Sequence, residues 1–129
     1  MPRRIYNPRL PHATQKAAAW YCQCYPGWVR ERYAILESSP KPPEVPTKGT
    51  KISDPTVQKV ARLEGITKNI KAIEFAKTTI EEGYREGVWN NAVYKKPFPD
   101  YGSVNTWKYH KNRFLYVVAM ELSLPLERD

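Results

Sequence analysis

The sequence predicts an all-α fold with an N-terminal helix pair, a proline-rich connector, one long helix and a C-terminal helix-turn-helix-like unit. Apolar residues recur at intervals of three and four along most of the 129 residues, which is the spacing of amphipathic helices. Prolines and glycines gather at a few positions and divide the chain into segments of helical length. The chain length fits a single globular domain.

Residues 1–12 are predicted to form a basic N-terminal arm. The stretch MPRRIYNPRLP contains arginines and prolines but no acid, which is typical of a terminal segment that lies on phosphates without secondary structure of its own. It lacks the apolar core of a secretory signal, and no apolar run approaches the roughly 20 residues that cross a bilayer. We therefore expect a cytoplasmic protein without a membrane partner.

Residues 13–38 are predicted to form two short helices that meet at Pro26 and Gly27, because these residues interrupt the helical pattern. Residues 39–52 follow as an extended linker, since their prolines cannot sustain a helix. Aromatic and aliphatic side chains at helical spacing predict a buried face on the two helices. This face comprises Ala17, Trp20, Tyr21, Cys24, Trp28, Tyr33, Ile35 and Leu36.

Residues 53–86 are predicted to form one long helix. Asp54 is placed to accept backbone N–H groups as the N-cap, and Pro55 fits the first helical position. An aliphatic stripe continues along most of this helix, so we expect it to pack on the N-terminal helices along one part and on a second subunit along the rest. The stripe comprises Val57, Val60, Ala61, Leu63, Ile66, Ile70, Ile73, Ala76 and Ile80. The basic residues expected on a solvated face are Lys59, Arg62, Lys68, Lys71 and Lys77.

Residues 87–124 are predicted to form the helix-turn-helix-like unit. A short helix is expected to end before Pro97, and the connection PFPDYG leads into a last helix that Ser103 caps and that reaches about Leu122. The same order of elements also describes many small helical hairpins. On a helical wheel the core face of the last helix comprises Val104, Trp107, Phe114, Leu115, Val118 and Leu122.

The opposite face of the last helix is predicted to contact DNA. Its polar residues are concentrated in the N-terminal half, the half with which a recognition helix contacts base edges. Amide, basic and hydroxyl side chains suit bases and phosphates, and the net charge of +8 favours a polyanionic partner. The alternative is a cationic surface that only keeps the protein soluble. The predicted DNA-binding residues are Ser103, Asn105, Thr106, Lys108, Tyr109, Asn112, Arg113, Lys95 and Lys96.

The sequence predicts neither a metal site nor catalysis. Cys22 and Cys24 have poor spacing for a disulfide or a zinc site, although His12 and His110 could in principle complete a set of four ligands. The acidic residues Glu81, Glu82 and Glu86 lack matching Asp or His neighbours, and no glycine-rich phosphate loop is present. We expect two reduced thiols, no cofactor, no catalytic residues and a protein that is not an enzyme.

Several short strings resemble the RinA and ArpU group of phage and prophage transcriptional regulators. They are the break at Tyr25-Pro26, the proline-rich connector, SDPT at 53–56, KAIEFA at 71–76 and the final SVNTWKYHKNRFLYVVAMEL. The resemblance covers the chain from Ala13 to Leu124. It implies an activator of late phage genes, with a C-terminal unit similar to region four of bacterial sigma factors.

The resemblance also implies partners and a location: double-stranded DNA, host RNA polymerase and further copies of the chain, in the cytoplasm of a bacterial host. The sequence departs from the family in PFPDYG. This connection occupies much of the space in which family members have the first helix and the turn that precede the recognition helix. The alternative function is therefore a phage protein-interaction or DNA-packaging component, resembling a small terminase subunit or a host-factor inhibitor, that has lost sequence-specific DNA reading. A membrane-surface role for Trp107 and Phe114 is a third reading, but a protein core explains this apolar face better.

Overall fold

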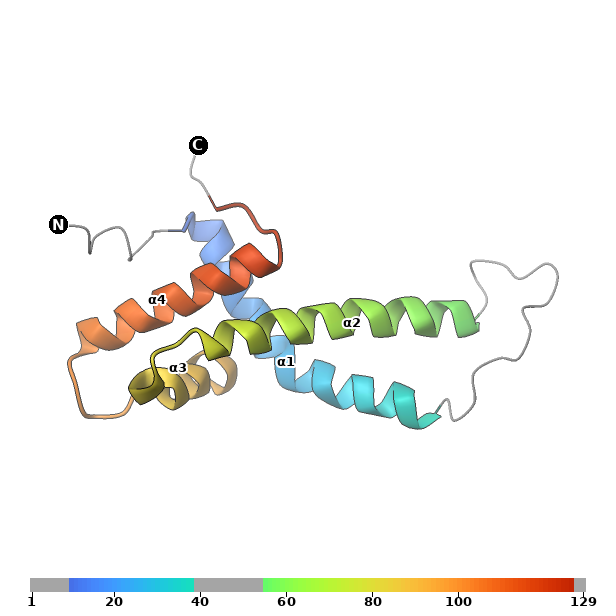
Figure 1. The fold of residues 1–129 in the computed structure, drawn as a ribbon, viewed down its shortest axis with the longest axis horizontal. Coiled ribbons are helices and arrows are strands. Elements are labelled where there is room, and N and C mark those ends of the chain that lie inside the picture. The colour runs from blue at the N-terminus through green and yellow to red at the C-terminus, as the bar shows by residue number, and fades with distance from the viewer. Residues whose placement is uncertain (1–9, 39–54, 127–129) are drawn as a thin grey trace.

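The computed structural model describes residues 10–38 and 55–126, and within these ranges all regular structure is helical. The helices are α1 (His12–Ser38), α2 (Pro55–Thr78), α3 (Glu82–Tyr94) and α4 (Val104–Glu121) (Figure 1). The predicted all-α class is confirmed. Most of the basic arm, the linker at 39–52 and the Asp54 N-cap lie outside the described residues. No helix within the described ranges is both long enough and apolar enough to cross a membrane.

α1 is one continuous helix, so the predicted break into two helices is wrong. Pro26 lies inside it, and Figure 1 shows the helix changing direction about midway. A proline removes one backbone hydrogen bond and bends a helix without necessarily ending it. Here Cys22 is buried in the core before the bend, and Tyr25 and Trp28 pack against the core on either side of Pro26. Tertiary packing thus holds both halves of the helix in place.

The predicted long helix is also wrong in extent, because α2 ends at Thr78. The hydroxyl groups of Thr78 and Thr79 donate to the carbonyl oxygens of Phe75 and Ala76, at 2.6 and 2.7 Å. Such bonds compete with helix continuation. The side chain of Arg85 then donates to the Ile80 carbonyl oxygen at 3.0 Å, which fixes the turn into α3. Residues 82–86 therefore belong to α3, and Pro55 begins α2 as predicted.

The hydrophobic core lies where all four helices meet. Figure 1 shows α3 and α4 beside the N-terminal part of α1 and the C-terminal part of α2. The fully or nearly fully buried core residues are Ala18, Cys22, Ile73, Ala76, Ile80, Val88, Trp89, Ala92, Val93, Trp107, Phe114, Leu115, Val118 and Ala119. We call this part of the molecule the core end.

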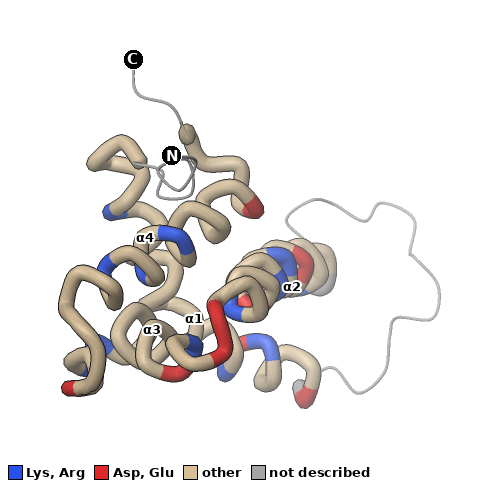
Figure 2. The backbone as a smooth tube through the Cα atoms, turned by 60° about the vertical axis from the view of Figure 1, so that its left-hand side comes forward, with Lys and Arg blue, Asp and Glu red and all other residues tan. Residues whose placement is uncertain are grey.

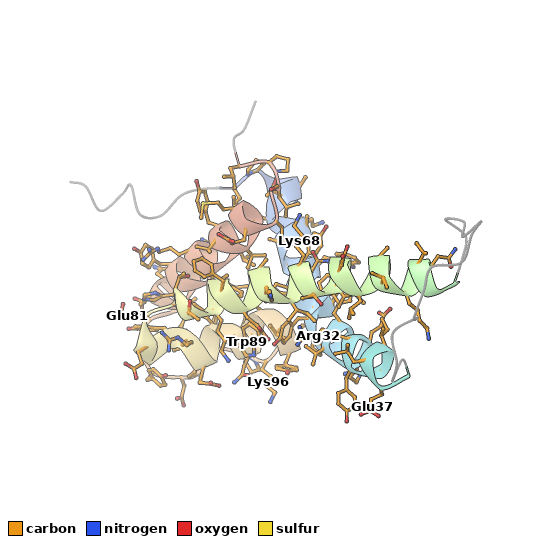
Figure 3. All side chains as sticks on the ribbon, turned by 45° about the vertical axis from the view of Figure 1, so that its right-hand side comes forward. Arg32, Glu37, Lys68, Glu81, Trp89 and Lys96 are labelled. Atoms are coloured by element: carbon orange, nitrogen blue, oxygen red, sulfur yellow. The ribbon has the colours of Figure 1, made fainter. Side chains whose placement is uncertain are left out.

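The remaining halves of α1 and α2 project from the core end as a two-helix arm (Figure 1). We define the arm as residues 29–38 and 55–63. Figure 3 shows Glu37 at the tip of the arm and Glu81 at the opposite end of the molecule. An ion pair between Arg62 and Glu31, with N···O distances of 2.7 and 2.9 Å, joins the two helices. Two helices bury only the stripe along which they touch, so the arm leaves large apolar side chains exposed.

Several residues predicted to be buried are exposed. Trp20, Tyr33 and Leu36 of α1 are more than half exposed, and the small or slender residues Ala18 and Cys22 are buried instead. Small side chains let α1 approach its neighbours closely, and this places the aromatic rings at the edge of the contact. Trp20, Tyr21 and Trp28 pack on one another there, with ring centroids 5.3 to 6.2 Å apart. Further exposed members of the predicted apolar stripes are Val57, Val60 and Ala61.

The connection between α3 and α4 is not a tight turn. Residues 95–103 run back along α3, since the Asn91 amide donates to the Lys96 carbonyl oxygen at 2.8 Å and the Tyr101 hydroxyl donates to the Gly83 carbonyl oxygen at 3.2 Å. α4 therefore starts beside the start of α3, and the two helices run in the same direction (Figure 1). A helix-turn-helix joins two crossed helices by three or four residues. The connection therefore differs from that of a helix-turn-helix, and the predicted helix-turn-helix-like unit is not confirmed.

Trp107 anchors this connection to α4. Its indole N–H donates to the Tyr101 carbonyl oxygen at 2.7 Å, and Phe98 stacks on its ring with centroids 5.5 Å apart. A Cβ atom on Gly87 would lie 2.6 Å from the same ring, so only glycine allows α3 to approach it this closely. The predicted core face of α4 is otherwise confirmed except at Val104, which is 60% exposed because the first turn extends beyond the core.

Candidate nucleic-acid interface

A groove with a volume of about 580 Å³ lies between the N-terminal part of α1 and the N-terminal half of α4. Asn91 of α3 and Phe98 of the connecting segment complete its wall. We call it the α1–α4 groove. The residues that line it are His12, Gln15, Lys16, Ala19, Asn91, Phe98, Lys108, Lys111, Asn112 and Leu115.

The described lining of the α1–α4 groove contains cations but no carboxylate. Lys16 comes from α1, and Lys108 and Lys111 come from α4. The first turn of α1 has no acidic residue, so the partial positive charge of this helix end has no local side-chain counter-charge. Figure 2 shows basic positions (blue) along α1 and α4 and acidic positions (red) where α2 passes into α3. The groove therefore favours an anionic ligand.

Lys111 is the most enclosed of the three lysines that line the groove. It is partly buried, and burial lowers its pKa. The nearby thiol of Cys22 does not supply a counter-charge, because burial raises the pKa of Cys22 to about 12, with Lys111 opposing that rise. No carboxylate of the described residues pairs with Lys111. The partly buried ammonium group of Lys111 is therefore free to pair with a bound anion.

The structure places the predicted DNA-binding residues in four locations. Lys108 and Asn112 line the α1–α4 groove. Asn105 and Arg113 are exposed further round α4, with the Arg113 guanidinium 5.8 Å from the ring centroid of half-buried Tyr109.

The remaining predicted residues have other neighbours. Ser103 is the N-cap of α4 and accepts from the backbone N–H of Thr106 at 3.1 Å. The two hydroxyl oxygens lie 3.0 Å apart, so both side chains also stabilise the helix start. Lys95 and Lys96 do not line the groove. Lys95 occupies the left-handed region with φ of 60°, and Figure 3 shows Lys96 on the side of α3 that faces away from α4.

Sequence reasoning missed six residues of the groove, which come from α1, α3, the connecting segment and α4. The residues missed are His12, Gln15, Lys16, Asn91, Phe98 and Lys111. One signal could have found His12, Gln15, Lys16 and Lys111, because both residues 10–30 and residues 101–120 contain no Asp or Glu. The fold packs these two acid-free stretches against each other, and that pairing depends on tertiary structure.

His110 lies on another side of α4, near Glu81. It is 8% exposed and stacks on Tyr84 with ring centroids 4.1 Å apart. Its Nε2 atom is 3.9 Å from a carboxylate oxygen of Glu81. Burial lowers the pKa of His110, Glu81 raises it to a smaller extent, and Arg113 lowers it further. Among the described residues no group of three or more His, Cys, Asp or Glu is arranged to hold a metal ion.

A second groove, the α2–α4 groove, differs from the first in charge. It has a volume of about 720 Å³, and its lining includes two lysines, Lys68 and Lys71, and two glutamates, Glu64 and Glu121. Lys68 projects from α2 in Figure 3. The charges in the α2–α4 groove are therefore balanced. Lys68 and Lys71 are exposed, as Lys16 and Lys108 are, so they serve as a comparison in neutral surroundings.

Comparison with known proteins adds no relatives: no family model, no curated protein and no solved structure matches this chain. The resemblance to the RinA and ArpU group stays a prediction.

Proposed function

We propose that this protein is a phage-type DNA-binding transcriptional regulator that binds the DNA backbone through the α1–α4 groove. The observation that carries the proposal is the apposition of two acid-free stretches, which brings three lysines into one groove with no carboxylate in its described lining. Phosphate contacts of this kind supply much of the affinity of proteins for DNA. Its location would be the cytoplasm of a bacterial host, and late-gene activation would follow from the family resemblance.

The exposed face of α4 next to the groove would read the bases. Asn105 and Arg113 are exposed there, and amide and guanidinium groups pair with adenine and guanine. α4 follows a long connecting segment and runs in the same direction as α3, so its approach to DNA would differ from that of a helix-turn-helix. Phosphates held by Lys16 and Lys108 would set the position of the helix on the duplex.

A matched pair of double variants tests the proposal. Lys16→Gln with Lys108→Gln removes two exposed charges from the α1–α4 groove, and Lys68→Gln with Lys71→Gln removes two from the α2–α4 groove. We expect the first to weaken binding of duplex DNA from the source locus about tenfold or more, and to reduce the slope of log K against log salt by about 1.8, at roughly 0.9 per phosphate contact. Fluorescence anisotropy at several salt concentrations measures both.

The control variant should lose less than about threefold, because its lysines are screened and not directed at phosphate. Equal losses in the two double variants would mean that only net charge matters, and the groove assignment would then be wrong.

The exposed apolar arm favours a second candidate, a phage protein-interaction or DNA-packaging component. Tyr33, Leu36, Val57 and Val60 are between 39% and 66% exposed, and grouped apolar residues of this kind mark protein contacts. Sedimentation in the absence of DNA distinguishes the two functions. Ring-sized assemblies without sequence-selective DNA binding would favour the packaging component, and monomers or dimers that bind the source locus selectively would favour the regulator.

A further inference from the structure

Phe98 gives the α1–α4 groove an aromatic surface. One face of its ring stacks on Trp107, with an interplanar angle of 16°, and the residue also lines the groove. Trp107 is itself fixed by its hydrogen bond to the Tyr101 carbonyl oxygen and by its close contact with Gly87. Phe98 is therefore a half-buried ring on a rigid support. Nucleic-acid bases stack on such rings in proteins that bind single strands.

Polar groups for a base edge lie in the same groove. Asn91, Gln15 and Asn112 contribute amide groups to the lining, and amides both donate and accept hydrogen bonds. Asn91 donates to the Lys96 carbonyl oxygen, while its Oδ1 atom is buried and has no donor. Buried acceptors without partners are uncommon in folded proteins. Because the Oδ1 atom of Asn91 has almost no accessible surface, the amides that can reach a base edge are those of Gln15 and Asn112.

The groove has the size and charge for one nucleotide. Its volume of about 580 Å³ falls within the range of roughly 300 to 1,000 Å³ of small-molecule sites. A groove of this volume is far too small to enclose a duplex. Lys111 is partly buried without a carboxylate partner, and Lys108 is exposed beside it. A nucleotide would bring an aromatic base to Phe98 and a phosphate to these lysines.

We infer that the α1–α4 groove binds an unpaired nucleotide of a nucleic-acid strand, with the base on Phe98 and the phosphate at Lys108 and Lys111. The inference rests on the proposed DNA-binding function and adds to it the class of ligand. A duplex would place its backbone along the basic surface, and an end, bubble or overhang would place one unpaired base in the groove.

The test compares a blunt DNA hairpin with the same hairpin that has an overhang of five thymidines or five uridines. We expect tighter binding of an overhang, by about tenfold, which corresponds to the stacking of one base on an aromatic ring. A preference for either overhang supports the inference, and the comparison of the two shows whether the strand is DNA or RNA. Equal affinity for the blunt and overhang probes contradicts it, and the proposed duplex binding would then stand alone.

Phe98→Leu tests the ring. Leucine keeps an apolar contact with Trp107 but cannot stack on a base, so we expect Phe98→Leu to abolish the overhang preference, measured as the ratio of the overhang affinity to the blunt-hairpin affinity. Phe98→Tyr should retain the preference. Phe75→Leu, in the α2–α4 groove, is the matched control. Circular dichroism and thermal unfolding verify the folding of each variant.

The inference is wrong if Phe98→Leu weakens both probes equally or changes neither. A different result would show that the proposed function is wrong: the affinity for the blunt hairpin would be unchanged in the Lys16→Gln, Lys108→Gln double variant.

Discussion

The core end and the arm are built from the same two helices but differ in what surrounds them. At the core end α1 and α2 meet α3 and α4, and Ile73, Phe114 and Val118 are fully buried. In the arm the two helices meet only each other, and Val60 and Leu36 of the same apolar patterns are at least half exposed. An amphipathic pattern thus indicates which face a helix can bury, while the number of helices packed against it decides how much of that face is buried.

The largest expected difference is between two leucines. Leu115→Ala at the core end removes a side chain that is 2% exposed, and Leu36→Ala in the arm removes one that is 57% exposed. We expect the first to lower the free energy of unfolding by about 2 to 5 kcal/mol, from lost burial and the cavity left behind, and the second by less than about 0.5 kcal/mol. Urea unfolding followed by circular dichroism measures both. Similar losses would show that the arm is covered in solution.

Two glycines should respond to alanine with opposite signs. At Gly87 a Cβ atom would lie 2.6 Å from the Trp107 ring and 2.9 Å from Pro99 Cδ, while at Gly65 nothing lies within 4 Å. Gly87→Ala should therefore cost about 1 to 3 kcal/mol from overpacking. Gly65→Ala should stabilise by about 0.5 to 1 kcal/mol, because alanine loses less conformational freedom in a helix. Thermal unfolding of the two variants measures the sign of each stability change. Stabilisation by Gly87→Ala would contradict the close packing of α3 against Trp107.

The core end should become less stable as the pH falls from 7.5 to 5.5. Burial lowers the pKa of His110 in the folded state, so the unfolded chain takes up a proton near its ordinary pKa of about 6.5 while the folded chain resists it. Stability is then present above this pH and is lost below it. His110→Gln should flatten the dependence, and His12→Gln, at an exposed histidine, should not. Urea titrations at pH 7.5, 6.5 and 5.5 measure the slope, and an unchanged slope in His110→Gln would contradict the assignment.

The smallest expected effect is in the arm. The hydrogen bonds from Arg62 lower the pKa of Glu31, but both side chains are exposed to solvent and exposed ion pairs contribute little. Glu31→Gln should shift the urea midpoint only within the experimental error, and 0.5 M NaCl should remove any remaining shift because it screens the pair. A large, salt-resistant loss would show that the pair is shielded by a partner.

The sequence predicted the helices better than their limits. The start of α2 at Pro55 and the Ser103 cap of α4 depend on local chemistry, and both are confirmed. The predictions of a break at Pro26 and of one helix over residues 53–86 were wrong, because helix continuity at these points depends on contacts between residues distant in sequence. Core packing carries α1 through Pro26, and the Arg85 side chain closes the turn after Thr78.

The candidate site was predictable only in part. Lys108 and Asn112 were found because a helical wheel separates the two faces of α4. Lys16 was missed because it belongs to α1, which is far from α4 in sequence. Phe98 was missed because it lies in the connection before α4, which local rules describe only as a turn. The two acid-free stretches were visible in the sequence, but the sequence did not show that they face each other.

Local interactions within the sequence therefore determined the helical class, the helix caps and the inner and outer faces of α4. Hydrogen bonding within one turn and the burial of one apolar stripe are properties of neighbouring residues. Only the tertiary structure decided which stripes are covered, that the connection after α3 runs back along that helix, and that α1 and α4 form a cationic groove. These features depend on how many helices meet at one place, which no single segment specifies.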